Sequence, residues 1–540
     1  MAFVLKLIFI GLIKNIHLRK DLTSDQRYTV SEGTISYLNT LDAPVRIDIF
    51  LSGELPSLYR DLRGELDVFL NQLKFHTDLL IIEYNDPFEI GSTDQVIQEM
   101  QRYGMSPEIV IENRDGQRSE SIVFPWMIVN YGEVSERVFL LDKQLGDTDR
   151  DKITRSIQQI EYLILDGIRK VTLKEKPNLA VLTSHTTTEN IKLADLLQSL
   201  QPYYNLGSFN LKNPEVSPTQ TLNNLKRFDA LLVSNPSEPF DQKEKYILDQ
   251  YELQGGGILW LVNGIGIDRD SLFKNAGKTY GFPLELNLDD YFFNQGIRLN
   301  KTLIQDLYCA PLVLASGNQN NTQYIPYPWP YYPQSKPTSN IIGQSVGTVL
   351  TQFTSPIDTL KNELNKKVLL ETSAFTKTIG APVSLSLEQA TKKIQPSTFN
   401  ERSRILGVLV EGTRKSLFSN RIKPIDYDIH LDKGATKTIL FGDGDLGENQ
   451  TDKGAPLQLG YDKWTSNFYA NKQLLINSIH YLSGNQQMLS VRQKDLNFVF
   501  LEPEKIASKG FLLKLSLIIS TVFISFFFGW LIQRGRSKHL

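Results

Sequence analysis

The sequence predicts an α/β protein with two folded domains and one C-terminal helix that crosses a membrane. Three observations support this prediction. Strand patterns alternate with amphipathic helical patterns from residue 45 onward. The strands of the second half are apolar throughout, which is typical of parallel strands covered on both faces of a sheet. Residues 511–532 are apolar on every face.

The first folded domain is predicted over residues 21–173. Its first strand alternates apolar and charged residues, and the helix that follows repeats leucines at helical spacing. The expected elements are strands at 45–51, 79–84, 108–112 and 119–129, and helices at 55–73, 93–103 and 153–168. The order β-α-β-α-β-β-α, with Pro107 just before the third strand, is that of a thioredoxin-like domain. Without thiols, this fold is expected to serve as a scaffold or docking surface.

A second α/β domain with a parallel sheet is predicted over residues 178–488, after a linker at 174–177. The three glycines at 255–257 follow a helix, so we interpret them as helix C-caps and not as a phosphate cradle, which would open a helix. No P-loop motif occurs in the sequence. Residues 289–360 are expected to be rich in loops. The expected elements are strands at 179–183, 228–240, 258–264, 367–372, 404–410 and 437–441, and helices at 190–200, 241–253 and 467–483.

Composition argues against several classes of function. A net charge of −2 and a pI near 6.4 argue against nucleic acid as a partner. Cys309 is the only cysteine, which excludes an intramolecular disulfide and a CxxC redox pair. We interpret it as a small buried hydrophobe. The six histidines show no metal-ligand spacing. The sequence therefore predicts no catalytic residue, no cofactor and no metal.

The predicted membrane helix covers residues 511–532, where Lys514 is the only charge. At about 1.5 Å per residue it is roughly 33 Å long, enough for a hydrocarbon core of about 30 Å. The basic tail at 533–540 favours the cytoplasmic side. The folded domains, joined by a stalk at 489–510, are then expected in the periplasm, outside the inner membrane. Ser525 and Gly529 share a helix face that either packs against a neighbouring helix or contacts lipid.

The N-terminal segment, residues 1–20, is predicted to be a short hydrophobic anchor. Residues 1–13 are apolar apart from Lys6. As a helix they would cover only about 20 Å, which is short for a span. Two alternatives stay open: a longer span clipped at its start, and a segment that lies in the interface or in a protein core.

The richest polar cluster is GDGDLGEN at residues 442–449, directly after an expected strand. Asp443, Gly444 and Asp445 are the candidate ligand residues, because ligands of open α/β sheets bind at the carboxyl ends of the strands. In one interpretation the aspartates coordinate a cation or accept hydrogen bonds from a ligand. In the other they form a tight turn by bonding local amides.

A second unusual segment, at residues 324–334, interleaves five aromatic residues with four prolines. Such a segment docks a partner in polyproline II form, or it braces the sheet as a stiff loop. The sequence leaves both interpretations open.

Several segments in collinear order resemble a known family. They are RKDLTSDQRYTVSEGTISYLNTLDAPVRIDIFLSGELP at 19–56, DDYFFNQGIRLNKTLIQDLYCAPL at 289–312, the PYPWPYYP segment, FTSPIDTL at 353–360, and FGDGDLGEN followed by NKQLLINSIHYLSG at 471–484. Over about residues 19–532 the chain resembles the gliding motility-associated ABC transporter substrate-binding proteins of the Bacteroidetes, the GldG family.

The resemblance implies membrane anchors and two periplasmic domains, the second similar to class I glutamine amidotransferases. It also implies a GldF-like ABC permease and a GldA-like ATPase as partners, in gliding and its linked secretion. An amidotransferase-like nucleophile would stand at the end of the strand at 258–264, where this sequence has Asn263. Because an amide is not a nucleophile, we expect an inactive site.

The predicted function is therefore a non-enzymatic, membrane-anchored periplasmic accessory subunit, of substrate-binding type, in an ABC transporter complex. Two alternatives stay open. One is a mechanical or assembly component of the gliding machinery without a ligand, and the other is a degenerate hydrolase on an amidotransferase-like fold. The sequence names no transported solute.

Overall fold

The computed structural model describes residues 29–485, with gaps at 90, 115–116, 275–276 and 319–320, together with 489, 514–516 and 518–530. The chain divides into two compact units, Met1–Lys494 and Asp495–Leu540. The predicted N-terminal anchor at 1–20, nearly all of the stalk and the basic tail lie outside the described residues.

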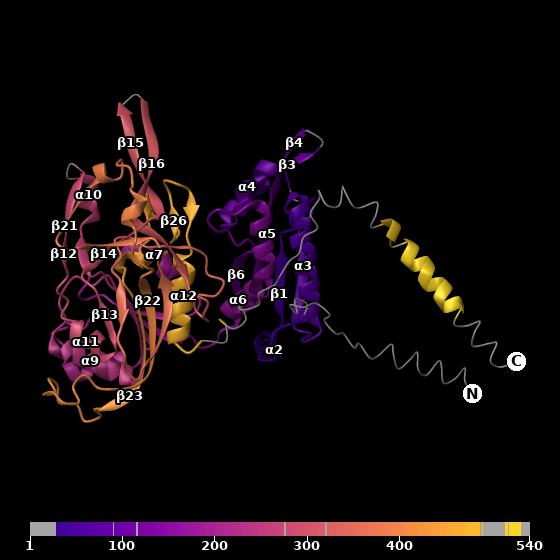
Figure 1. The fold of residues 1–540 in the computed structure, drawn as a ribbon. Helices are drawn as coiled ribbons and strands as arrows, with labels where there is room; N and C mark the ends of the chain where they lie inside the picture. Colours follow the sequence, from indigo (N-terminus) through magenta and orange to yellow (C-terminus); the bar gives the residue numbers. More distant parts are fainter. Residues whose placement is uncertain are drawn as a thin grey trace. The chain divides into compact units, whose positions relative to one another are not determined.

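The N-terminal part of the chain forms a four-stranded mixed sheet in the order β2–β1–β5–β6 (Figure 1). β1 and β2 run parallel, whereas β5 runs antiparallel to both β1 and β6. The elements of this part are α2 (Glu32–Leu38), β1 (Val45–Ile49), α3 (Ser57–Lys74), β2 (Leu80–Tyr84), η1 (Pro87–Glu89), α4 (Thr93–Arg102), β3 (Glu108–Arg114), β4 (Gln117–Val123), β5 (Trp126–Tyr131), β6 (Val134–Phe139), α5 (Asp149–Gln158) and α6 (Ile160–Thr172).

Helices cover both faces of this sheet. Met127 and Val129 are fully buried on one face, where α6 approaches so closely that a Cβ on Gly167 would lie 3.0 Å from Val129. On the other face, Met100 of α4 and Phe124 form a core with Ile128. The α/β class of this part is confirmed, and its assignment as thioredoxin-like stays a prediction.

Three expectations for this part are wrong in detail. The strand predicted at 108–112 is present as β3, but it pairs with β4 in a separate two-stranded hairpin and does not join the four-stranded sheet. The predicted strand at 119–129 is two strands that break at Pro125, since proline removes a ladder donor. The predicted helix at 153–168 is two helices, α5 and α6, which meet at Gln159. Alternating apolar residues such as Ile109 and Ile111 resemble a half-buried strand, yet both are exposed.

The second sheet combines a parallel half with an antiparallel half, in the order β15–β16–β19–β22–β23–β10–β9–β7–β8. β8, β7, β9, β10 and β23 run parallel to one another. From β23 onward each next strand is antiparallel. The expectation of a parallel sheet is therefore wrong for the strands beyond β23, because an apolar strand reveals its burial but not its direction.

The elements of this part begin with β7 (Asn178–Leu182), α7 (Asn190–Leu200), β8 (Asn205–Phe209), α8 (Pro218–Leu225), β9 (Ala230–Ser234), α9 (Gln242–Leu253), β10 (Gln254–Leu261), β11 (Ile265–Ile267), α10 (Arg269–Lys274), β12 (Lys278–Pro283), α11 (Asp289–Asn294), β13 (Ile297–Leu299), β14 (Thr302–Asp306), β15 (Cys309–Asn318) and β16 (Asn321–Pro337). They continue with β17 (Val349–Leu350), β18 (Ile357–Thr359), β19 (Asn365–Glu371), β20 (Thr376–Gly380), β21 (Val383–Ser386), η2 (Leu387–Gln389), η3 (Pro396–Thr398), β22 (Ile405–Lys415), β23 (Lys433–Phe441), η4 (Gly444–Gly447), β24 (Thr451–Asp452), β25 (Ala455–Pro456), β26 (Tyr461–Asp462), β27 (Asn467–Phe468) and α12 (Asn471–Leu482).

Two hydrophobic cores hold this sheet, one on each face. Trp260 of β10 packs with residues of α8, α9 and α11, whereas its neighbour Leu259 packs with residues of α7 and α12. Successive strand residues face opposite sides of a sheet, so β10 is buried on both. Gly255, two residues after the end of α9, has φ 104°, and in this left-handed region glycine is favoured. Because both faces of the sheet are covered, polar loops meet at the ends of its strands.

The segment at 289–360 is not loop-rich, because β13 to β18 lie within it. The proline-rich residues 324–334 belong to β16, which forms a long hairpin with β15 (Figure 1). Trp329 and Tyr331 are buried, whereas Tyr324 is 62% exposed. The second half of the segment therefore braces the core, and the first half lies toward the hairpin tip.

Among the described residues, no helix is both long enough and apolar enough to cross a membrane. The predicted span at 511–532 is described only at 514–516 and 518–530, and both stretches are helical. Ser525 donates a hydrogen bond to the carbonyl oxygen of Thr521 (2.9 Å), and Gly529 has open space around it. The complete segment extends outside the described residues.

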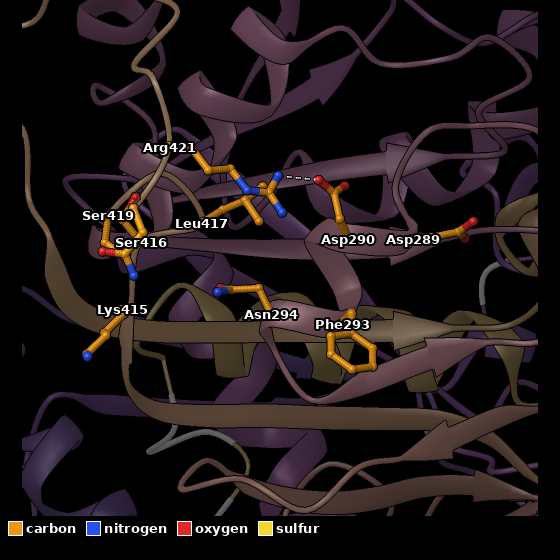
Figure 2. A pocket seen from close by; sticks show the side chains of 10 residues that line it. Asp289, Asp290, Phe293, Asn294, Lys415, Ser416, Leu417, Ser419 and Arg421 are labelled. Carbon is orange, nitrogen blue, oxygen red and sulfur yellow. Dashed lines mark hydrogen bonds and ion pairs between the residues drawn. The ribbon is translucent and has the colours of Figure 1, made fainter.

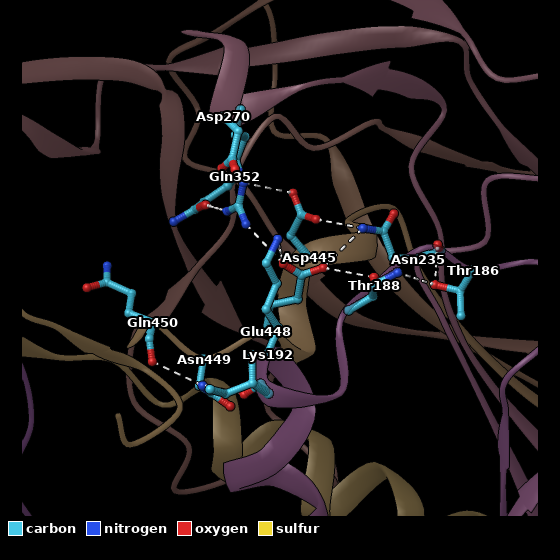
Figure 3. A network of polar contacts seen from close by, with 12 residues as sticks. Thr186, Thr188, Lys192, Asn235, Asp270, Gln352, Asp445, Glu448, Asn449 and Gln450 are labelled. Carbon is cyan, nitrogen blue, oxygen red and sulfur yellow. Dashed lines mark hydrogen bonds and ion pairs between the residues drawn. The ribbon is translucent and has the colours of Figure 1, made fainter. Parts of the chain in front are cut away.

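Polar side chains gather at both ends of the second sheet. At the end where β22 finishes, an open cleft lies between α11 and residues 415–421 (Figure 2). At the opposite end, where β10 and β23 finish, a polar network joins several loops (Figure 3). The predicted site residues belong to the second of these places.

Candidate functional site

The predicted residues Asp443, Gly444 and Asp445 lie beside Asn263, at the carboxyl end of the parallel strands. As predicted, the first three residues follow one strand, β23, and Asn263 follows another, β10. The Gly444 N–H donates to the Asn263 side-chain oxygen (2.8 Å), and the Asn263 amide donates to Asn235, which follows β9 (3.3 Å). The structure therefore brings together all four residues that the sequence singled out in this domain.

Asp443 is occupied by main-chain donors. Its carboxylate accepts the N–H of Asp445 (2.9 Å), which caps η4, and the N–H of Gln352 (2.7 Å). Only 2% of the residue is exposed. Burial, and then the charge of Asp445, raises the pKa of Asp443 well above its usual value. The bond from Asp445 is local, as in the tight-turn interpretation, whereas the bond from Gln352 joins a segment that is distant in the sequence.

The centre of the network is formed by two residues that the sequence analysis did not single out, Arg269 and Glu448. Figure 3 shows Glu448 within this network. Arg269, from α10, donates to Glu448 (3.0 Å) and lies 3.7 Å from Asp445. Glu448 also accepts from Thr188 (3.1 Å) and Asn235 (3.1 Å). Glu448 stands inside the GDGDLGEN motif, so its position was visible in the sequence, whereas nothing local signals Arg269.

The charges of the network are mutually dependent. Burial opposes the charge of Arg269, yet Asp445 and Glu448 together raise the pKa of its guanidinium. Burial, and then Asp445, raises the pKa of Glu448, while Arg269 and Lys192 act in the opposite direction. Lys192 lies 3.8 Å from Glu448. The arrangement holds the loops after β7, β9, β10 and β23 together through the chain's own side chains.

The network is closely packed around Gly444. A Cβ on Gly444 would lie 2.6 Å from the Asn235 side chain and 2.8 Å from the Asn263 amide. Among the described residues, no group of three or more His, Cys, Asp or Glu side chains is arranged to hold a metal ion. The geometry therefore supports a structural role at the edge where related sheets bind ligands.

Three side chains, a serine and a histidine after β7 and a glutamate of α9, form a hydrogen-bonded row that the sequence analysis missed. Ser184 Oγ lies 3.0 Å from His185 Nδ1, and His185 Nε2 lies 3.0 Å from Glu244. The order resembles a catalytic triad. However, the imidazole is fully buried and stacks on Phe240 at 3.9 Å. Glu244 also accepts the N–H of Asp241 (2.6 Å) in the capping box of α9. This row of side chains therefore anchors the loop after β7 to the start of α9.

Cys309 is not poised for catalysis. Burial raises the pKa of its thiol from 9.0 to about 11, so the thiol is protonated at neutral pH. Since the thiolate is the nucleophile, the side chain is unreactive there.

Comparisons with known proteins place the second part of the chain in a family. Residues 176–478 match the family model described as "ABC-type uncharacterized transport system", and residues 24–130 match a domain of unknown function (DUF7088). No curated protein matches the chain. Two solved structures show weak likeness. The mmIFT52 N-terminal domain is 14% identical, with 56% of this chain and 96% of that chain covered and a TM-score of 0.33. A putative ThuA-like protein from Parabacteroides merdae ATCC 43184 is 8% identical, with 58% and 91% covered and a TM-score of 0.26.

Such low TM-scores carry no argument about fold or function. The family match is different, because it covers more than half of the chain. The chain therefore belongs to the auxiliary-protein family of the ABC-type uncharacterized transport systems.

Proposed function

We propose that this accessory ABC transporter subunit is anchored in the inner membrane, lies mainly in the periplasm and serves gliding motility and its linked secretion. The family match supports the accessory role. The finer assignment rests on the collinear resemblance to the GldG family, including residues 19–56 and 289–312. Its partners are then a GldF-like permease and a GldA-like ATPase.

We further propose that the subunit is not an enzyme. The observation that supports this best is the occupied carboxyl edge, where Asn263 binds the Gly444 N–H and Arg269 binds Glu448. A degenerate hydrolase would need a nucleophile at this edge, and Asn263 supplies none. The buried His185 is engaged in anchoring a loop. A mechanical component without a ligand is the remaining alternative.

Co-purification tests the accessory role. The full-length chain, tagged and expressed at its natural level, is expected to carry a permease and an ATPase through purification in mild detergent. Recovery with a soluble partner alone would favour the mechanical alternative, and recovery without any partner would contradict the proposal.

The C-terminal helix supplies a matched pair of variants for the same experiment. Leucine at Gly529 adds bulk to the small-residue face shared with Ser525, so it is expected to weaken recovery of the permease. Leucine at Ser520 adds bulk on the opposite side of a helix, because nine residues at about 100° each bring it there. Equal losses in the two variants would reduce this helix to a lipid-exposed anchor.

Topology is tested with a reporter that is active only in the cytoplasm. Fused after Leu540, it is expected to be active, because the basic residues of the tail favour the cytoplasmic side. Fused after Gly484, ahead of the predicted span, it is expected to be inactive. The opposite pattern would place the folded domains in the cytoplasm.

A further inference from the structure

The cleft between α11 and residues 415–421 has the size of a small-molecule site. Its volume is about 650 Å³, and it is open to solvent at the end of the second sheet away from the Asp443 network (Figure 2). Clefts of this volume commonly accommodate small molecules. One wall carries Asp290, Phe293 and Asn294 of α11, and the other carries Ser419 and Arg421.

The second wall is held in place by a buried carboxylate. Asp249 of α9 accepts hydrogen bonds from the Ser416 hydroxyl (2.6 Å) and the Leu417 N–H (3.0 Å). It also accepts one from the guanidinium of Arg414 (2.6 Å). Asp249 is fully buried. These bonds therefore fix the first residues of the segment 415–421. A wall that is already ordered loses less conformational entropy when a ligand binds.

The charge of Arg421 is only partly compensated by the carboxylate that it contacts. Asp290 is shared between two cations, the fully buried Lys245 (2.9 Å) and Arg421 (2.6 Å). Burial opposes ionisation of Asp290, but hydrogen bonds from Arg421 and Lys245 lower its pKa, so the carboxylate is charged. The other lining carboxylate, Asp289, lies 3.3 Å from Lys301, which also bonds Glu285 (3.0 Å). Because Asp290 divides its charge between two cations, Arg421 can still attract an anion.

Donors remain free on both walls. Arg421 reaches across the cleft toward Asp290 (Figure 2), and among the described residues its guanidinium makes no second hydrogen bond. Asn294 accepts from Arg414 (3.0 Å) through its oxygen, and its amide N–H groups have no partner within the described part of the chain. The Ser419 hydroxyl is likewise without a partner there. Guanidinium, amide and hydroxyl groups together suit an anion with hydroxyl neighbours.

An aromatic ring completes the site. Phe293 is 65% exposed although it is apolar, and it lines the same cleft. Pockets that combine an apolar face with a few placed polar groups orient small ligands. The ring offers a flat surface for the C–H face of a sugar, which a bare inorganic anion would not use.

We propose that this cleft binds a small anionic sugar derivative, with its carboxylate or phosphate on Arg421, its hydroxyls on Asn294 and Ser419, and its ring against Phe293. This inference is independent of whether the chain works with a permease, because it concerns direct binding to the chain.

Calorimetry on the full-length detergent-solubilised chain tests the proposal. Glucose 6-phosphate and glucuronate are the probes, with inorganic phosphate and glucose as comparisons. We expect at least one of the two sugar anions to bind more tightly than either comparison. The Arg421→Gln substitution is expected to weaken that binding about tenfold, as the loss of a hydrogen bond to a charged group does. The Phe293→Ala substitution is expected to weaken binding of the sugar anion but not binding of inorganic phosphate.

The matched control is Lys423→Gln, which removes the same charge two residues away, outside the cleft lining. It is expected to leave binding unchanged. Equal weakening by Lys423→Gln and Arg421→Gln would show attraction to the general surface charge and overturn the site. Absence of binding by both sugar anions, or glucose bound as tightly as they are, would overturn it as well. If inorganic phosphate binds as tightly as the sugar anions, Phe293 contributes nothing to binding. The proposal that the ligand is a sugar derivative would then be overturned.

Discussion

Replacement of Arg414 by methionine is expected to lower the free energy of unfolding by about 3–5 kcal/mol, the usual cost of removing one partner from a buried ion pair. The guanidinium of Arg414 bonds Asp249 (2.6 Å) and Glu252 (2.7 Å), and both carboxylates are fully buried. Methionine has similar length but no charge, so two buried carboxylates would lose their cation. Urea unfolding of the full chain, followed by tryptophan fluorescence, measures the loss.

The control for this prediction is an exposed pair. Lys367 lies 2.7 Å from Glu411, but 43% of its side chain is exposed. Methionine at Lys367 is expected to cost at most about 1 kcal/mol, because water screens the pair. Comparable losses in the two variants would show that burial of the Arg414 pair does not govern its contribution.

The loss at Arg414 is also expected to depend on pH. Burial raises the pKa of Glu252 above 4.5, whereas Arg414 is the first group that opposes this. Without Arg414 the pKa rises further, so the folded state binds more protons than the unfolded state. Stability then falls as pH rises above 4.5, and the deficit of the variant is smaller at pH 5 than at pH 8.

Replacement of Gly442 by alanine is expected to be destabilising by about 3 kcal/mol, at the upper end of what overpacking costs. A Cβ at this position would lie 2.0 Å from the carbonyl oxygen of Ser355. The two segments cannot easily separate, because the Ser355 N–H and the Thr354 hydroxyl both donate to the Gly442 carbonyl (2.7 and 2.9 Å). The thermal unfolding midpoint of the full chain provides the measurement.

Alanine at Gly380 is the matched control, because a Cβ there would meet nothing within 4 Å. Its effect is expected to stay within about 0.5 kcal/mol. Since Gly442 directly precedes Asp443, the alanine variant is also expected to increase proteolysis within residues 443–448. Unchanged stability and unchanged proteolysis would mean that the segment around Ser355 moves aside at no cost in free energy.

Local patterns determined much of what the sequence revealed. The apolar runs that became β7 and β10 and the helix α7 between polar loops were predicted near their observed positions. The local hydrogen bond at Asp443 matches one of the two interpretations that the sequence left open. These features depend on side-chain periodicity and on short-range hydrogen bonds, which neighbouring residues encode. The family resemblance led as far as an accessory ABC transporter subunit, which the family match confirms.

Only the tertiary structure decided how distant segments combine. The direction of β22 against β23 follows from non-local pairing, since a strand buried on both faces looks the same in either direction. Arg269 contacts Glu448, and Arg421 shares Asp290 with the buried Lys245, across long stretches of sequence. Each of these side chains is an ordinary charged residue in its own segment. Their roles arise from burial and from partners that the folded chain brings within hydrogen-bonding distance, and neither quantity is a property of local sequence.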